Sequence, residues 1–207
     1  MRILAVADTE CKSLREHYRP EYMRQIDLVL ACGDLDADYL TFLADVVHGP
    51  VLYVHGNHDE NFHKAPPEGC ICIEDRVFEY RGVRILGLGG SKRYRAGPHQ
   101  YTEREMRHRV RRLWWTLHRR GGFDILLTHA PALGLHDGAD LPHSGFDCFN
   151  RLLERYRPRY FLHGHVHQRY GGGFVRRDDR GATRVINADG QYLFDYETGA
   201  EYRATLW

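Results

Sequence analysis

An apolar segment that ends in polar residues sets the pattern of this chain. Residues 51–59 read VLYVHGNHD, so an apolar run leads directly into Gly56-Asn57-His58-Asp59. Residues 26–34 read IDLVLACGD and lead in the same way into Gly33-Asp34. Near-continuous apolar runs predict strands that are covered on both faces, as in a parallel sheet. The glycine at each strand end permits a sharp turn and a close approach of the backbone to a ligand.

Three further polar clusters lie at the ends of other apolar runs. They are Asp8-Thr9-Glu10, Thr128-His129-Ala130 and Gly164-His165-Val166-His167. The carboxyl ends of parallel strands meet along one edge of a sheet, so loops from different strands can converge on one ligand. The sequence therefore predicts that five loops, far apart along the chain, form a single polar site.

Apolar runs of β-type composition alternate with amphipathic stretches along the chain. The predicted strands are Arg2–Ala7, Ile26–Ala31, Val51–His55, Val77–Tyr80, Val83–Leu88, Asp124–Thr128, Tyr160–His163, Arg184–Asn187 and Gln191–Asp195. The predicted helices are Asp36–Val47, Thr102–Arg120 and Gly145–Tyr156. The second helix opens with a capping-box pattern, Thr102 and Glu105, and closes at Gly121. This order predicts one α/β domain over residues 1–207, with β-rich additions toward the C-terminus.

Composition and charge narrow the classes of function. The chain has 207 residues, of which 43% are hydrophobic and 28% charged, as is typical of a soluble globular domain. The formal net charge of +1 gives no overall attraction to nucleic acid or to an anionic membrane. The apolar run at the N-terminus is too short for a signal peptide or a membrane span. An odd number of cysteines, five, predicts reduced thiols, and these features together predict a cytoplasmic protein without membrane contact.

The residue types in the five clusters suit a pair of divalent cations. Carboxylate and amide oxygens favour manganese, magnesium or iron, whereas imidazole nitrogens also suit zinc and nickel. Manganese is the first expectation, with iron, magnesium, zinc and nickel as alternatives. Two ions ~3.5–4 Å apart can stabilise the attacking and the leaving oxygen of a phosphoryl displacement together. Water bound to such an ion loses its proton near neutral pH, so a separate protein base is not needed.

The ordered set of motifs resembles the calcineurin-like metallophosphoesterase superfamily. The resemblance spans Asp8 to His167, and its strength lies in the order and spacing of the motifs, since each is weak alone. It implies a four-layer αββα sandwich with a dinuclear metal site. Its implied ligands are Asp34 as a bridge, Asp8 and His167 on the first ion, and Asn57, His129 and His165 on the second. It also implies that His58 is a non-ligand near the leaving oxygen that acts as a general acid or stabilises the developing charge, and that Asp59 can orient its ring.

The first motif departs from the superfamily pattern. That pattern has a histidine two residues after the first aspartate, and this chain has Glu10 there. In one interpretation Glu10 is a ligand that shifts the preference toward manganese, magnesium or iron. In the other, Glu10 points away and the first ion is held by three protein ligands, which makes it weaker and exchangeable.

Substrate contacts are expected outside the metal motifs. Arg93 and Arg95 follow a glycine-rich strand end, and arginine binds phosphate through two parallel hydrogen bonds, although a plain solvent loop is the alternative. Residues 128–146 are similar to the corresponding stretch of small class III phosphodiesterases, which makes His143 a further candidate. The arginine-rich face of Thr102–Arg120 favours a solvated surface over nucleic acid or an acidic partner.

These observations predict an enzyme that hydrolyses a small or nucleotide-like phosphodiester by attack of a metal-bound hydroxide. A phosphomonoesterase or phosphatase is the first alternative. A metal-binding scaffold with weak catalysis is the second, and Glu10 keeps it open, whereas His58 argues against it, because scaffolds of this superfamily typically lack that histidine. The sequence leaves open the physiological substrate, the native metal and the choice between monomer and homo-oligomer.

Overall fold

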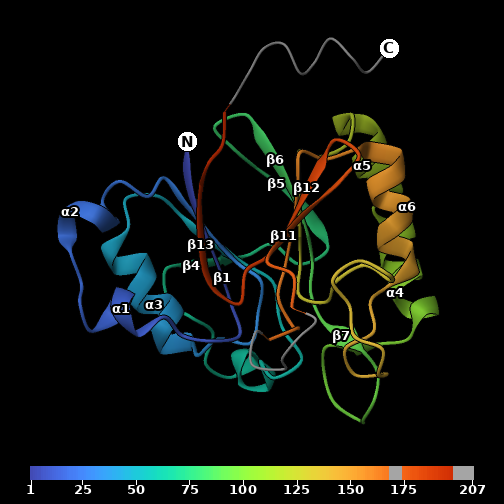
Figure 1. Ribbon diagram of the computed structural model, residues 1–207, viewed down its shortest axis with the longest axis horizontal. Coiled ribbons are helices and arrows are strands. Elements are labelled where there is room, and N and C mark those ends of the chain that lie inside the picture. Colours follow the sequence, from blue (N-terminus) through green and yellow to red (C-terminus); the bar gives the residue numbers. More distant parts are fainter. Residues whose placement is uncertain (168–173, 198–207) are drawn as a thin grey trace.

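Two β-sheets lie face to face in the centre of the molecule, with helices on both outer sides (Figure 1). The computed structural model describes residues 1–167 and 174–197. The predicted single domain, residues 1–207, includes two segments that lie outside the described residues.

The first sheet is mostly parallel. Its strand order is β13 (Gly190–Asp195), β1 (Arg2–Ala7), β2 (Leu28–Ala31), β3 (Val51–Tyr53) and β4 (Cys70–Cys72). Strands β1 to β4 pair in parallel, whereas β13 pairs antiparallel with β1. Strand β1 is therefore an inner strand, and its residues Ile3 to Ala7 are completely buried.

The second sheet has a parallel centre and antiparallel edges. Its strand order is β11 (Arg177–Arg180), β12 (Thr183–Asn187), β10 (Tyr160–His163), β9 (Ile125–Thr128), β6 (Val83–Leu88) and β5 (Arg76–Tyr80). Strands β12, β10, β9 and β6 run parallel. The hairpin β5–β6 turns at Arg81 and Gly82, both at positive φ, and a short pair, β7 (Ser91–Lys92) and β8 (Gln100–Tyr101), lies apart from both sheets.

Helices cover the outer face of each sheet. Helices α1 (Lys12–Arg15), α2 (Pro20–Met23) and α3 (Ala37–Val46) lie beside the first sheet, and α4 (Glu103–Arg112), α5 (Trp114–Arg120) and α6 (Asp147–Tyr156) beside the second (Figure 1). A short 3₁₀ helix, η1 (Glu60–His63), follows β3. Among the described residues, no helix is both long and apolar enough to span a bilayer.

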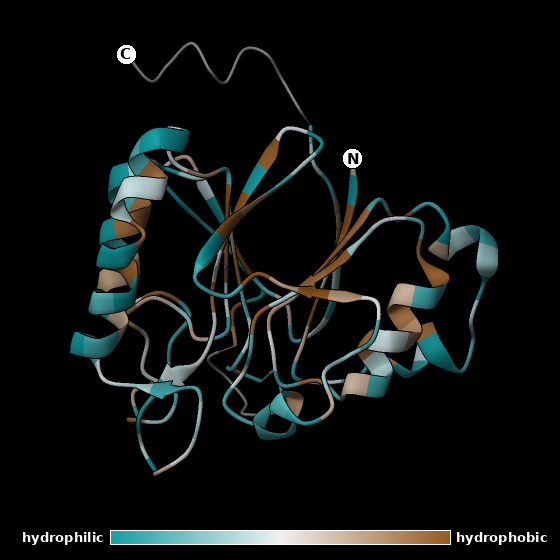
Figure 2. Cartoon of the chain, turned by 180° about the vertical axis from the view of Figure 1, so that it is seen from behind, coloured by the Kyte–Doolittle hydropathy of each residue, from teal (hydrophilic) through white to brown (hydrophobic). Residues whose placement is uncertain are grey.

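Three apolar clusters fill the spaces between the four layers. One, with residues such as Leu30 and Leu162, fills the space between the sheets. A second joins the second sheet to α4, α5 and α6, and a third joins the first sheet to α3 and its neighbours. Figure 2 shows the same division, with apolar residues along the strands and polar residues on the outer sides of the helices. The predicted four-layer αββα sandwich is confirmed.

Most predicted elements are present, with differences at short or interrupted ones. The capping box of Thr102 and Glu105 begins α4, and Gly121 ends α5 in a left-handed conformation. The helix predicted over Thr102–Arg120 is two helices, interrupted at Leu113, which has φ of −80° and ψ of −7°. The sequence did not predict α1, α2, η1, β4, β7, β8 or β11, each of four residues or fewer. All five cysteines are free, as predicted.

Candidate metal centre

Loops at the carboxyl ends of the parallel strands bring the predicted ligands to one end of the two sheets. In the first sheet Asp8 follows β1, Asp34 follows β2, and Asn57 comes four residues after β3. In the second sheet His129 follows β9 directly, and the loop after β10 carries His165 and His167. The predicted convergence of five loops is therefore present in the fold, and each sheet contributes its own residue types.

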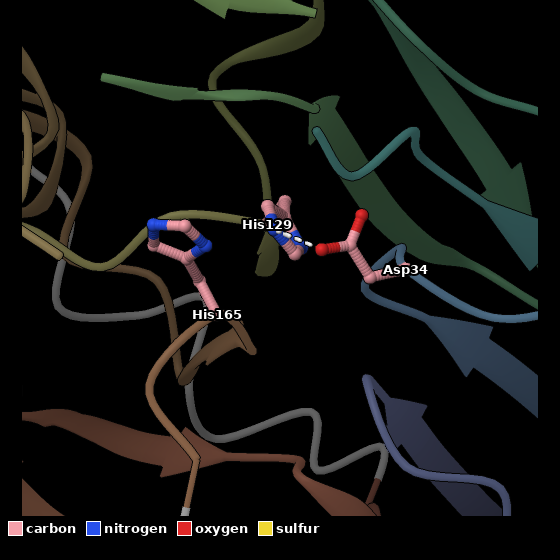
Figure 3. Close-up of side chains that lie close together, drawn as sticks. All are labelled: Asp34, His129 and His165. Atoms are coloured by element: carbon pink, nitrogen blue, oxygen red, sulfur yellow. Dashed lines mark ion pairs between the residues drawn. The ribbon is translucent and has the colours of Figure 1, made fainter. Parts of the chain in front are cut away.

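One group of side chains combines both sheets. Asp34, His129 and His165 offer ligand atoms that lie within 4.8 Å of one another (Figure 3). His129 Nε2 is 3.4 Å from Asp34 Oδ2 and 3.0 Å from Asn57 Oδ1. His129, Asn57 and His165 are all buried. Three of these side chains, Asn57, His129 and His165, are predicted to hold the second ion, and Asp34 is predicted to bridge it to the first.

Backbone carbonyls fix the orientation of both histidine rings. Nδ1 of His129 lies 2.8 Å from the carbonyl oxygen of Cys32, and Nε2 of His165 lies 2.7 Å from that of Pro142. Because a carbonyl only accepts, each of these nitrogens carries a proton and donates. Nδ1 of His165 can then offer a lone pair, whereas Nε2 of His129, which lies between the acceptor oxygens of Asp34 and Asn57, offers one once its own proton has left. Anchoring of the second ring nitrogen in this way is typical of metal-binding histidines.

A second group lies around Asp8. Asp8, His167 and Asp189 offer ligand atoms within 4.8 Å of one another. Oδ1 of Asp8 is shielded from solvent and has no hydrogen-bond partner among the described residues. A buried carboxylate oxygen without a partner is costly, and a cation is a suitable partner for it. Burial, assisted by the negative charge of Asp34, raises the pKa of Asp8 to about 7.

Charge in the centre follows from burial and close spacing. Burial favours the neutral form of Asp34, yet the adjacent His129 and the backbone N–H of His58 hold the pKa of this carboxyl well below its usual range. Burial lowers and Asp34 raises the pKa of His129, with a net rise to about 9. Burial lowers the pKa of His165 to about 3, which keeps that ring neutral. Carboxylates with a neutral, correctly oriented imidazole form a donor set that suits a divalent cation.

The carboxylates of the first sheet also fix the loops of other motifs. Asp8 Oδ2 accepts the backbone N–H of His165 at 2.8 Å, and Asp34 Oδ1 accepts that of His58 at 2.7 Å. Asp8, Asp34 and His165 all have a positive φ, of 59°, 55° and 70°. Such residues cost ~1–3 kcal/mol each, and they cluster at functional sites.

Two glycines make these close approaches possible. A Cβ on Gly56 would lie 2.0 Å from Oδ1 of Asp34, and one on Gly164 would lie 2.4 Å from Oδ2 of Asp8. Any larger residue at either position would therefore displace a carboxylate of the centre.

The predicted catalytic residues lie at the rim. His58 is exposed, and its Nδ1 is 3.4 Å from Nη2 of Arg95. Asp59 is buried, and its Oδ2 accepts the backbone N–H groups of Gly56 at 2.7 Å and of Asp34 at 3.1 Å. These contacts assign Asp59 to holding two loops together. The predicted orientation of the His58 ring by Asp59 stays a prediction.

The predicted substrate contacts divide into near and remote residues. Arg95 lies beside His58, whereas Arg93 donates to Glu105 at 2.9 Å, on the side of α4. The two arginines diverge because the chain bends after Lys92 instead of continuing as a strand. His143 bonds to Asp140, and its ring centroid is 5.5 Å from that of His165.

Glu10 lies apart from both groups. Its Oε2 is 3.7 Å from Nη1 of Arg15, and burial together with a hydrogen bond to Asp36 raises its pKa. Glu10 lines a cavity of about 570 Å³ that also reaches Asp8, Asp34 and His58.

Two residues near the centre were not predicted. Asp189 follows β12, and the hydroxyl of Tyr94 is 3.3 Å from Nδ2 of Asn57. The rule that located the other clusters, a polar residue after an apolar strand, applies equally to Asp189. Tyr94 gave no such signal, because it reaches Asn57 from a loop without periodicity.

The family model for calcineurin-like phosphoesterases matches residues 1–169. This chain belongs to the calcineurin-like phosphoesterase family. The members of this family use divalent metals, and the two groups described above supply candidate ligands for them.

Relatives and solved structures agree with this family. The chain is 28% identical to metallophosphoesterase domain-containing protein 1 of Homo sapiens over 155 residues, which are 71% of this chain and 44% of that protein. It is 24% identical to the UPF0046 protein C25E10.12 of Caenorhabditis elegans, over 76% of this chain and 62% of that one. The chain thus spans less than two thirds of either relative.

Two solved structures share the fold. TT1561 of Thermus thermophilus superposes with a TM-score of 0.60 at 15% identity, over 91% of this chain and 89% of that one. The 5'-nucleotidase of Candida albicans gives a TM-score of 0.54 at 13% identity, over 91% of this chain and 46% of that one.

Proposed function

We propose that this calcineurin-like phosphoesterase hydrolyses a small phosphodiester with the help of two divalent ions. The observation that carries the proposal is the meeting of two ligand groups at one end of the sheets, beside an exposed histidine and arginine. One group centres on Asp34, His129 and His165, and the other on Asp8 and His167. Family membership supports the reaction class.

The chain's own side chains suit the holding of both ions. Asp34 would bridge them, Asn57, His129 and His165 would hold the second ion, and Asp8 and His167 the first. When bound, two such ions neutralise charge on the phosphoryl oxygens and provide a nucleophile from water near neutral pH. Oxygen and nitrogen donors of this mixture suit manganese first. The buried carbonyl anchors on His129 and His165 hold the rings in place before the ions arrive.

His58 is placed to donate a hydrogen bond to the leaving oxygen. The guanidinium of Arg95 only donates, so Nδ1 of His58 accepts at their 3.4 Å contact. The neutral ring then carries its proton on Nε2. From Nε2 this exposed ring, next to the cavity, can donate a hydrogen bond that stabilises the charge developing on the leaving oxygen.

The charge of the cavity favours a diester over a monoester. The carboxylates of Glu10, Asp36 and Asp38 line the cavity, and so does one residue of opposite charge, Arg15. A diester carries one negative charge, whereas a monoester carries nearly two at neutral pH. The monoanion therefore meets less repulsion from these carboxylates. Arg95, beside His58, would contact one of its free phosphoryl oxygens.

The experiment measures hydrolysis of bis-p-nitrophenyl phosphate with added Mn²⁺, alongside p-nitrophenyl phosphate. We expect diester turnover that Asp34→Ala and Asn57→Ala each abolish. The control is Asp195→Asn, an exposed carboxylate at the opposite end of β1, which should leave turnover unchanged. Faster turnover of the monoester would contradict the preference for a diester. If neither substrate were hydrolysed with any of the divalent metals, the proposal that the protein is a phosphoesterase would be wrong.

A further inference from the structure

The residue expected to complete the first ion site faces elsewhere. Glu10 shares a hydrogen bond with Asp36 and lies 3.7 Å from Arg15, and its side chain is 33% exposed. Among the described residues it belongs to none of the groups whose ligand atoms converge within 4.8 Å. The first site, as predicted from the sequence, therefore keeps only Asp8, the bridging Asp34 and His167.

A different carboxylate, that of Asp189, lies beside Asp8 and His167. Asp189 lies between β12 and β13, and its backbone forms a parallel bridge with Ala7, the residue before Asp8. Its side chain is buried, with the whole residue 6% exposed. Oδ1 accepts the hydroxyl of Thr9 at 2.9 Å and lies 3.7 Å from Nδ1 of His167.

Asp189, Asp8 and His167 form a donor set on their own. Their ligand atoms lie within 4.8 Å of one another, and Oδ1 of Asp8 is shielded without a hydrogen-bond partner among the described residues. Asp189 is buried and Asp8 has a shielded oxygen, so the two carboxylates repel each other when both are ionised, and a cation between them would remove this repulsion.

We propose that Asp189 is a protein ligand of the first ion, in the position that the sequence assigned to Glu10. The inference rests on the proposed two-ion site. It adds β12 to the strands that build the centre, and it gives the first ion three carboxylates and one imidazole. Such a set is harder than one with two histidines and favours Mn²⁺, Mg²⁺ or Fe²⁺ over Zn²⁺.

The test measures Mn²⁺ binding to the metal-free protein by calorimetry and by electron paramagnetic resonance of free Mn²⁺. We expect the wild type to bind two ions, and Asp189→Asn to weaken one of them by more than ~100-fold, because loss of a direct ligand exceeds the 10–100-fold of an outer-shell change. Glu10→Gln should bind both ions within about twofold of the wild type, because its carboxylate lies outside the group. Retention of the other ion by Asp189→Asn shows that this variant is folded.

A second pair of variants separates ligation from a positioning role through Thr9. Thr9→Val removes the hydrogen bond to Asp189 and keeps its carboxylate, so we expect a much smaller loss than in Asp189→Asn. Asp189→His should shift the preference from Mn²⁺ toward Zn²⁺ by at least about tenfold, since imidazole is a softer ligand. Glu10→His should not.

Different results would contradict the role of Asp189 and the proposed two-ion site. Two ions bound with wild-type affinity by Asp189→Asn would overturn the inference and leave the two-ion site intact. Equal losses in Thr9→Val and Asp189→Asn would also overturn it. Fewer than two ions in the wild type would instead contradict the proposed function.

Discussion

At the scale of single residues, the carboxylates of the centre each have two tasks. One oxygen of Asp8 fixes the loop of His165 and one oxygen of Asp34 fixes the loop of His58, while the remaining oxygens face the ligand groups. The side chains of the first sheet thus determine where a histidine of the second sheet lies. Substitution of either aspartate would remove a ligand and release a neighbouring loop at the same time.

The contrast between two nearby arginines gives a test at this scale. Arg95 contacts His58, and Arg93 pairs with Glu105. If Arg95 contacts the substrate phosphate, Arg95→Ala should raise KM about tenfold, a loss of ~1.4 kcal/mol, with a smaller change in kcat. The matched control, Arg93→Ala, should leave both constants within about twofold. Steady-state kinetics on the diester decides, and an unaltered KM in Arg95→Ala would remove this role.

The sequence indicated the site residues that follow long apolar strands, and missed those whose role depends on three-dimensional packing. Asp34, His129 and His165 could be located because a strand end is visible as a change from apolar to polar residues. The placement of Glu10 could not, since the turn after Asp8 and the partner Asp36 decide it. Tyr94 reaches Asn57 through a tertiary contact that no local pattern records, whereas Asp189 follows an apolar strand and could have been found by the same rule.

At the scale of elements, a buried arginine connects α4 to the segment before β5. Arg109 donates to Asp75 at 2.9 Å and to the carbonyl of Gly89 at 2.8 Å, pairs with Glu74, and lies over the ring of Tyr101. Arg109→Ala would leave the Glu74 carboxylate largely buried without this partner, so we expect a loss of ~3–5 kcal/mol in the free energy of unfolding.

The control for this prediction is a neighbouring arginine. Arg107 is half-exposed and lies 3.7 Å from Glu103 in an (i, i+4) pair. Arg107→Ala should cost less than ~1 kcal/mol. Chemical denaturation of both variants measures the difference, and equal losses would show that Arg109 has no special role.

The same contact predicts a response to acid. Burial raises the pKa of Glu74, but its hydrogen bonds with His55 and the charge of Arg109 lower it overall, from 4.5 to about 2. Because the folded-state pKa is depressed, the ionised carboxylate stabilises the fold above about pH 4.5, and this stability is lost as the pH falls toward about 2. Glu74→Gln should therefore lose less of its free energy of unfolding over this range than the wild type. Parallel pH dependences would contradict the assignment.

Elements that consist of an apolar run were predictable, whereas short elements without a clear apolar period were not. The strands β1, β6 and β10 match their predicted bounds, because each is an apolar run of four to six residues between clear breaks. Helices α1 and α2 have four residues each and carry too few apolar positions to show a helical period. The interruption between α4 and α5 at Leu113 was not predicted, because the capping signals marked only the outer ends.

At the scale of the whole molecule, the proposed ions would connect the two sheets. Asp34 and Asp8 come from the first sheet, and His129, His165 and His167 from the second. A ligand that binds only the folded state stabilises it by ~2.7 kcal/mol at 100 times its dissociation constant. Removal of metal by a chelator should therefore lower the Tm, and Mn²⁺ should restore it. Asp34→Asn should show little of this shift, and an unchanged wild-type Tm would argue against binding across the sheets.

The antiparallel pairing of β13 with β1 has a consequence for synthesis on the ribosome. Strand β1 carries Asp8 at its end, yet one of its two hydrogen-bonding neighbours spans Gly190–Asp195, after every other described strand. Strand β1 therefore keeps one edge unpaired until the chain has been synthesised as far as Asp195. This pairing joins residues that lie far apart in the sequence, which raises the contact order and slows folding.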